Sequence, residues 1–196
     1  MTTTINEHEF FQGTFSRFLS EPVIDGKQSV LQAALLATKL GPVLVLADEE
    51  ALHFLAFIDC KNFEREVAKL QQKAKACIVR GKPAPSVFIE RELALYFEGK
   101  LQRFTTPLHY FGTPFQQRVW QALQQIPYGK TCSYAQLAVV VGNPLAFRAA
   151  ALANSVNQLA IIIPCHRVIN SGGALGGYAG SITRKKWLID HERLCK

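Results

Sequence analysis

Residues 161–168 read Ile-Ile-Ile-Pro-Cys-His-Arg-Val, and a glycine-rich stretch follows at 170–180. The apolar run Leu159–Ile163 predicts a short buried strand. Pro164 ends that run, so Cys165 is expected where the strand gives way to a turn. A histidine comes next. An imidazole beside a thiol can lower the pKa of the thiol and so make the sulfur a nucleophile. A bare Cys–His pair is nevertheless more often a structural thiol beside a surface histidine.

The composition of the chain indicates a globular protein with a modest basic excess. Of the 196 residues, 48% are apolar, enough for one large domain or two small ones that share a core. Lysine and arginine exceed aspartate and glutamate by 22 to 15, which gives a net charge of +7 and a pI of about 9.3. This excess suits a polyanionic partner, although many proteins carry it without one.

The cysteine pattern argues against a disulfide framework and against a thiolate zinc site. The five cysteines are odd in number and irregular in spacing: Cys60, Cys77, Cys132, Cys165 and Cys195. We predict no metal and no cofactor. Residues 1–25 lack a secretory signal, and no apolar run is long enough to span a bilayer. We expect a reducing, cytoplasmic location (the nucleoid in a prokaryote, the nucleus in a eukaryote) and no membrane partner.

The first half of the chain predicts a small α/β unit. Residues 1–28 mix phenylalanines with polar residues, which leaves open a short helix at 7–19 or a loosely held arm. Short turns between apolar segments favour an antiparallel meander, with strands at Val30–Leu40, Val43–Ala47 and Leu52–Ile58. Helical periodicity follows at Phe63–Val79 and Val87–Phe97. The predicted domains are an N-terminal arm of unknown role at 1–28, a supporting domain at 29–108 and a second domain at 109–196.

The second half predicts two short helices joined by a turn. A capping box at 113–116 starts a preceding helix, and a second box at 133–136 starts a helix that stops at Gly142. Asn143 is expected to cap the next helix, which runs to about Asn154. This arrangement is typical of a helix-turn-helix, but an ordinary helical hairpin has the same pattern.

The second helix of this pair is rich in alanine around a single arginine, Arg148. Alanines let a backbone approach a partner surface closely, and an isolated arginine beside them can reach inward. A tightly packed core helix with one solvated arginine would have the same sequence. The alanines are Ala146, Ala149, Ala150, Ala151 and Ala153.

Together these motifs resemble the O6-alkylguanine-DNA alkyltransferase family. The resemblance rests on Pro-Cys-His-Arg-Val after an isoleucine run, on the glycine-rich loop with its tyrosine, and on Trp-Leu-Ile-Asp-His-Glu at 187–192. It is continuous from about Gly112 to Leu194 and looser back to the hairpin near Gly41. It implies an α+β fold. An antiparallel, ribonuclease-H-like sheet would form the N-terminal unit, and a winged helix-turn-helix would carry the active site in the C-terminal unit.

The resemblance also implies direct reversal of DNA damage. A methyl or alkyl group would pass irreversibly, once per protein, from guanine O6 (and from thymine O4) in double-stranded DNA to Cys165. The protein would act as a monomer, bind the minor groove and flip the base out, because O6 is otherwise held in a base pair. Arg148 would fill the gap in the base stack, with Ala146, Ala149 and Ala150 against the DNA.

Further site residues follow from the same resemblance. His166 would take the thiol proton through a water, and Glu192 would orient the imidazole. Asn157 would act as a hinge; here Gln158 follows it, where relatives usually have proline. Tyr134 would stack near the guanine and donate to its N3. The pocket would be lined by Pro164, Val168, Tyr178, Ala179 and Gly180.

Other interpretations stay open from the residues alone. A cysteine hydrolase could use Cys165, His166 and Glu192, and it would show turnover. A lesion-sensing DNA-binding module could use the same helix-turn-helix, but alkyltransferase-like proteins of that kind lack the acceptor cysteine. A transcriptional response role would need a further zinc-bearing domain, for which residues 1–28 are too short.

Overall fold

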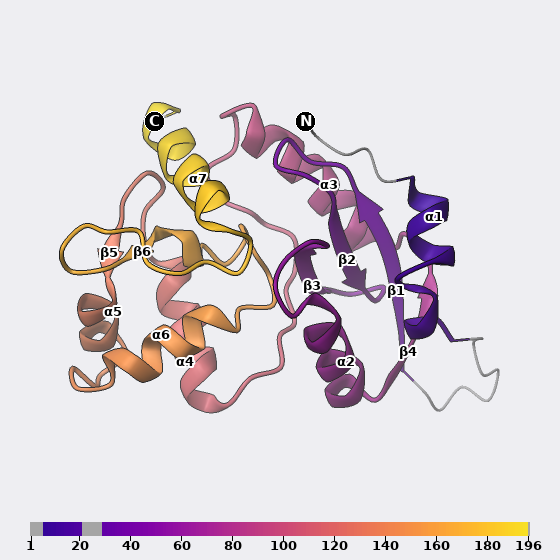
Figure 1. The fold of residues 1–196 in the computed structure, drawn as a ribbon, viewed down its shortest axis with the longest axis horizontal. Coiled ribbons are helices and arrows are strands. Elements are labelled where there is room, and N and C mark those ends of the chain that lie inside the picture. Colours follow the sequence, from indigo (N-terminus) through magenta and orange to yellow (C-terminus); the bar gives the residue numbers. More distant parts are fainter. Residues whose placement is uncertain (1–5, 21–28, 196) are drawn as a thin grey trace. The chain divides into compact units, whose positions relative to one another are not determined.

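The computed structural model describes residues 6–20 and 29–195. They form two compact units: the chain up to Ala94 with Thr105–Phe111, and Leu95–Phe104 with the chain from Gly112 onward. This division assigns 95–104 to the second unit, whereas the sequence placed the boundary near residue 108. The architecture is α+β, as predicted (Figure 1).

The first unit is built on a four-stranded sheet in the order β3–β2–β1–β4. Its strands are β1 (Ser29–Leu36), β2 (Val43–Ala47), β3 (Leu52–Phe57) and β4 (Ala76–Arg80). The first three strands pair antiparallel, as the predicted meander requires, but β4 pairs in parallel with β1. The sheet is therefore mixed rather than antiparallel throughout.

Residues 63–79, predicted as one helix, divide into helix α2 (Phe63–Ala74) and strand β4. Lys75 ends the helix in the left-handed region, at φ 50°. The apolar residues that follow are buried beside β1. The prediction of helix up to Val79 is wrong because a short apolar run after a helix cannot be assigned by periodicity alone.

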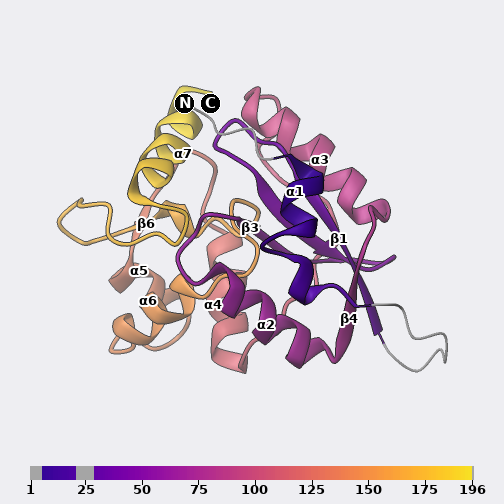
Figure 2. The same ribbon diagram turned by 45° about the vertical axis from the view of Figure 1, so that its right-hand side comes forward.

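Helices cover both faces of this sheet. Helix α1 (Glu7–Gln12), the 3-10 segment η1 (Ser16–Phe18) and α2 lie on one side, and α3 (Ala84–Phe97) lies on the other (Figures 1 and 2). Four phenylalanines of the N-terminal segment are buried in the core on the first side: Phe10, Phe11, Phe15 and Phe18. Residues 6–20 are therefore packed, while 1–5 and 21–28 lie outside the described residues.

The second unit places helices around a very short sheet. The helices are α4 (Pro114–Gln124), α5 (Tyr134–Val140), α6 (Phe147–Ser155) and α7 (Ile182–Leu194). Strands β5 (Cys132–Ser133) and β6 (Val168–Ile169) pair in parallel between them. Both predicted capping boxes are present, and α5 and α6 form the two-helix element.

The predicted start of α6 is wrong. The helix begins at Phe147, and not at Pro144 with Asn143 as its cap, because a turn comes first, closed by a 3.0 Å hydrogen bond from the N–H of Ala146 to the carbonyl of Asn143. No helix in the described part of the chain combines the length and apolar character that crossing a membrane requires.

Candidate active site

Cys165 follows two tight turns instead of a strand. The first is centred on Ile161, whose φ of 73° is left-handed, and is closed by a 2.9 Å hydrogen bond between the flanking residues. The second is centred on Pro164 and closed by a 2.7 Å bond from the N–H of Cys165 to the carbonyl of Ile163. These are γ-turns of opposite hand, and the first is the rare, strained form. The predicted strand Leu159–Ile163 is wrong because this backbone doubles back.

Asn157 joins the end of the helix-turn-helix to the cysteine. Its side-chain amide donates to Sγ of Cys165 at 3.1 Å and to the carbonyl of Ile163 at 2.8 Å. Its Oδ1 accepts from the N–H of Leu159 at 3.0 Å. These hydrogen bonds fix the segment although Gln158, and not proline, comes next.

The thiol is buried and protonated at rest. Cys165 is 6% exposed, and burial raises its pKa, while the hydrogen bond from Asn157 and the charge of Lys185 act in the opposite direction. The sequence predicts that the neighbouring imidazole can lower this pKa, and the burial of the thiol acts against that effect. A base that can take the thiol proton is therefore needed for the sulfur to react as a thiolate.

Lys185 is a buried cation close to this thiol. It is 0% exposed, and its ammonium donates to the carbonyls of Val168 at 2.6 Å and Gly177 at 3.3 Å. Burial lowers the pKa of Lys185 to about 8, against the attraction of the Cys165 charge. The lysine thus ties the glycine-rich loop to β6 and favours negative charge on the sulfur.

His166 and Glu192 form a buried pair. Nε2 of His166 lies 2.7 Å from Oε1 of Glu192, with the two side chains 0% and 1% exposed. Burial opposes charge on Glu192, but hydrogen bonds from His166 and Arg167 lower its pKa to about 2. Since an ionised carboxylate only accepts, Nε2 carries the proton. Burial lowers the pKa of His166, so the ring is neutral and Nδ1 is its free base.

Several further donors converge on the Glu192 carboxylate. Arg167 reaches it through Nε at 2.9 Å and Nη2 at 3.0 Å, Tyr96 through its hydroxyl at 2.8 Å, and Gly129 through its N–H at 3.0 Å. Burial, then the charge of Glu192, raises the pKa of Tyr96 well above its usual range. The carboxylate is therefore held rigidly, and it in turn fixes the tautomer of the imidazole.

Tyr134 begins α5 and faces the glycine-rich loop. A Cβ added to Gly176, which has a φ of 66°, would lie 3.5 Å from the phenol oxygen of Tyr134. Burial, then the charges of Cys165 and Cys132, raises the pKa of Tyr134. The phenol is therefore a neutral hydrogen-bond donor beside the glycine-rich loop.

The other residues predicted for the pocket lie at the two ends of this loop. Pro164 and Val168, both buried, flank the 3-10 segment η2 (Cys165–Arg167). Tyr178 is half-buried, Ala179 exposed and Gly180 buried, just before α7. The carbonyl of Gly180 accepts from Arg184 at 3.0 Å.

Helix α6 presents Arg148 and Ala149 to solvent. The Arg148 guanidinium lies 5.5 Å from the ring centroid of Phe147, and this phenylalanine is 44% exposed. Ala146 is half-buried, whereas Ala150 is 0% exposed. The expectation of a DNA contact at Ala150 is corrected, because its side chain packs inside the second unit.

The sequence interpretation missed three residues of this site: Arg167, Lys185 and Tyr96. Lys185 lies seven residues before Glu192, on the same face of α7, and helical spacing could have signalled it. Arg167 stands in the quoted motif without a role. Tyr96 is 96 positions from its partner, and nothing local points to that contact.

A buried thiol beside a His–Glu pair, joined through Asn157 to the two-helix element α5–α6, is the arrangement expected of a DNA-binding protein with cysteine chemistry. Two family models match the chain. Residues 114–194 match the DNA-binding domain of 6-O-methylguanine DNA methyltransferase, and residues 31–110 match its ribonuclease-like domain.

Individual relatives agree with these matches. The constitutive methylated-DNA–protein-cysteine methyltransferase of Bacillus subtilis is 41% identical over 160 residues, which cover 80% of this chain and 92% of that protein. The methylated-DNA–protein-cysteine methyltransferase of Methanosarcina acetivorans is 37% identical, covering 83% and 98%. The crystal structure of Mycobacterium tuberculosis OGT in complex with DNA has a TM-score of 0.72 at 35% identity, covering 85% of this chain and 94% of that one.

The chain belongs to the methylated-DNA–protein-cysteine methyltransferase family. It acts in DNA repair by alkyl transfer to a cysteine, and DNA is its partner.

Proposed function

We propose that Cys165 is the alkyl acceptor and that the substrate is O6-alkylguanine in double-stranded DNA, with O4-alkylthymine as a second substrate. The observation that carries this assignment is the environment of one sulfur. Among the cysteines, Cys165 receives a 3.1 Å hydrogen bond from an amide and lies beside a buried lysine and a neutral imidazole.

The transfer is a displacement at carbon. Sγ of Cys165 forms a bond to the alkyl carbon while the bond from that carbon to O6 breaks, and the electron pair of that bond passes to guanine. The thiol proton goes through a water to Nδ1 of His166, because Nε2 is already committed to Glu192. Charge on the imidazolium is then stabilised by the carboxylate.

The departing guanine needs a hydrogen-bond donor near its developing charge. Tyr134, kept neutral by its raised pKa, is proposed to donate to N3 and so to stabilise the charge that develops on the ring. The thioether product has no route back to thiol with these groups, so each molecule acts once.

Access to O6 requires extrusion of the base from the duplex. We propose that α6 enters the minor groove, with Arg148 filling the gap in the stack and Ala146 and Ala149 allowing close approach. The pocket for the extruded base would lie between the segment 164–168 and the loop end at 178–180. The protein would work as a monomer in the compartment that holds DNA, where thiols stay reduced.

The test is the intact mass of the protein after incubation with a duplex that contains O6-methylguanine. We expect one methyl group per protein, on the peptide with Cys165, and none in Cys165→Ser. Cys132→Ser is the matched control, since this half-buried cysteine of the same unit has no role in the transfer. Methylation of Cys165→Ser would overturn the assignment.

The same experiment separates repair from cysteine hydrolysis. A stoichiometric acceptor consumes one lesion per protein and then stops. A hydrolase would release product continuously and regain its unmodified mass.

A further inference from the structure

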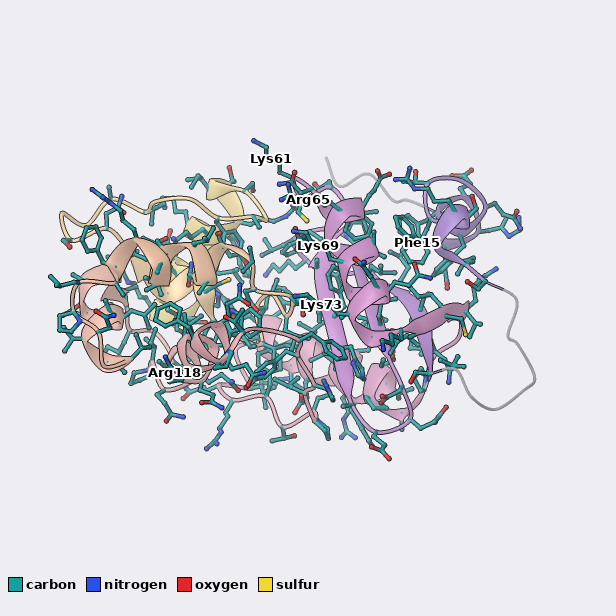
Figure 3. The ribbon with its side chains drawn as sticks, turned by 90° about the horizontal axis from the view of Figure 1, so that it is seen from below. Phe15, Lys61, Arg65, Lys69, Lys73 and Arg118 are labelled. Carbon is teal, nitrogen blue, oxygen red and sulfur yellow. The ribbon has the colours of Figure 1, made fainter. Side chains whose placement is uncertain are left out.

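Helix α2 of the first unit carries a line of cations on one side. Lys61, just before the helix, is followed at intervals of four residues by Arg65, Lys69 and Lys73. Residues four apart lie on the same face of an α-helix, and Figure 3 shows these four side chains along one side of α2. We call these four residues the α2 basic stripe.

The opposite face of α2 is fixed to the sheet. Phe63, Val67 and Leu70 are 4%, 0% and 0% exposed, within the core of the first unit. The side chains of Arg65 and Lys69 are 60% and 45% exposed. The stripe is therefore a rigid row of outward cations on a well-anchored helix.

The stability of the helix explains only part of this arrangement. Arg65 in the first turn opposes the macrodipole, whereas Lys73 in the last turn agrees with it. Like charges at four-residue intervals destabilise a helix, and the helical part of the stripe contains two such pairs, Arg65 with Lys69 and Lys69 with Lys73. Only Glu66 offsets them, at 3.3 Å from Arg65 and 3.0 Å from Lys69.

Within the described residues, the two end members of the stripe lack the carboxylate contact that Arg65 and Lys69 have. Lys61 and Lys73 form no ion pair with any residue in the described ranges 6–20 and 29–195. The other glutamate of the helix, Glu64, pairs with Arg17 instead. A row of like charges that disfavours the helix and is only partly neutralised, by Glu66, suits a polyanionic partner.

Two polyanionic surfaces could fit, namely a nucleic acid backbone and an anionic membrane. A membrane-binding helix also presents apolar side chains to the bilayer, but the large apolar residues of α2 are all buried. The helical part of the stripe, from Arg65 to Lys73, spans roughly 12 Å, which corresponds to about three to four phosphates of one strand measured along the DNA axis. Phosphate contacts of this kind carry no sequence preference.

We propose that the α2 basic stripe binds the phosphate backbone of duplex DNA, as a second DNA contact outside the helix-turn-helix. This rests on the proposed function, which supplies DNA as the partner. Through this contact the first unit would contribute to DNA affinity independently of the DNA sequence.

The test compares the full-length chain with Lys61→Gln/Lys73→Gln on an undamaged duplex of more than two helical turns, over a series of salt concentrations. Each phosphate contact contributes about 0.9 to the slope of log affinity against log salt. We expect the slope of the variant to fall by about 1 to 2. The matched control is Lys39→Gln/Lys82→Gln, which removes the same charge from exposed positions of the same unit.

The outcomes separate this surface from the active site. Alkyl transfer from free O6-methylguanine base, which has no phosphate, should be unchanged in Lys61→Gln/Lys73→Gln. An unchanged slope, or an equal fall in the control, overturns the stripe. The proposal is also overturned if the chain binds phosphatidylserine vesicles, if only Lys61→Gln/Lys73→Gln loses that binding, and if DNA binding by this variant stays intact. If the unsubstituted chain did not transfer the alkyl group at all, the proposed function would be overturned. The salt-slope result would still be valid.

Discussion

The side-chain amide of Asn157 lies 3.1 Å from Sγ of Cys165. An N–H directed at sulfur stabilises the thiolate more than the thiol, and this hydrogen bond lowers a pKa that burial raises. The same amide bonds the carbonyl of Ile163 at 2.8 Å. One side chain therefore sets both the position of the nucleophile and its ease of ionisation.

Replacing Asn157 by alanine should slow transfer. We expect the rate with a methylated duplex to fall by about 10- to 100-fold, because a charge-assisted hydrogen bond contributes about 1.5–3 kcal/mol. The measurement is single-turnover methylation followed by mass spectrometry over a pH series.

The pH profile distinguishes electrostatics from misfolding. The rate of Asn157→Ala should recover towards the original value at high pH, where the thiol ionises without help. A deficit of the same size at every pH would mean that the side chain only maintains the turn. Gln158→Ala, at the neighbouring buried position, is the control for the turn.

Replacing Tyr96 by phenylalanine tests the support of Glu192. The hydroxyl donates 2.8 Å to the oxygen that also accepts from His166. Loss of this hydrogen bond should make the Glu192 carboxylate more basic, which raises the pKa of His166. The acid limb of the rate profile, where the imidazole becomes protonated, should therefore move to higher pH. The maximal rate should fall less than ten-fold, since Arg167 and Gly129 still hold the carboxylate. An unmoved limb would contradict this coupling; Tyr110→Phe, in the first unit, is the control.

Arg148→Ala should separate base extrusion from chemistry. Arg148 is exposed on α6 and makes no hydrogen bond to the cysteine or its partners. We expect repair of duplex DNA to slow by about 10-fold or more, since refilling the stack offsets an unstacking cost of a few kcal/mol. Reaction with the free alkylated base should be nearly unchanged.

Arg118→Ala is the matched control for this comparison, because Arg118 is an exposed arginine of α4 in the same unit. Equal slowing of both reactions in Arg148→Ala would show that Arg148 does not act in the base stack.

The sequence predicted those parts of the fold that local rules determine. The boxes at Thr113 and Ser133 start their helices as expected, because each depends on residues three positions apart. The parallel pairing of β4 with β1 depends on residues 47 positions apart, such as Val30 with Cys77, and the apolar run itself was ambiguous.

The same division applies to the active site. Cys165, His166 and Glu192 carried a family motif, which could be recognised without coordinates. The γ-turn at Ile161 could not be predicted from the sequence, because isoleucine disfavours a φ of 73° and the local pattern favours a strand. The raised thiol pKa likewise comes from burial, which depends on tertiary packing.

Methylation of Cys165 should weaken the fold. The sulfur is 6% exposed and surrounded by buried residues, so one added methyl crowds a packed site. Overpacking of this kind costs about 1–3 kcal/mol. Urea unfolding of the methylated protein should show a lower midpoint with an unchanged slope. Cys165→Ser incubated with the same DNA is the control, and equal midpoints before and after methylation would contradict the expectation.

Acid stability should report the Glu192 cluster. The pKa of Glu192 is about 2 in the folded protein against an ordinary value of 4.5. A depressed carboxyl pKa contributes stability above the unfolded value, and that stability is lost as pH falls from about 4.5 to 2. The loss amounts to about 3 kcal/mol. Urea unfolding at pH 7 and pH 3 should therefore differ more in the unsubstituted chain than in Glu192→Gln, which cannot titrate.

Glu192→Gln will itself be less stable at pH 7, because Arg167 loses a buried partner at 2.9 Å. The comparison therefore uses the change with pH within each variant rather than the absolute stability. Glu90→Gln removes an exposed carboxylate that pairs with Lys82, and it should keep the full acid dependence because surface pairs contribute little. If Glu192→Gln keeps that dependence as well, acid does not destabilise the protein through the buried cluster. The ionised state of Glu192, from which the proton on Nε2 of His166 was inferred, would then lack support.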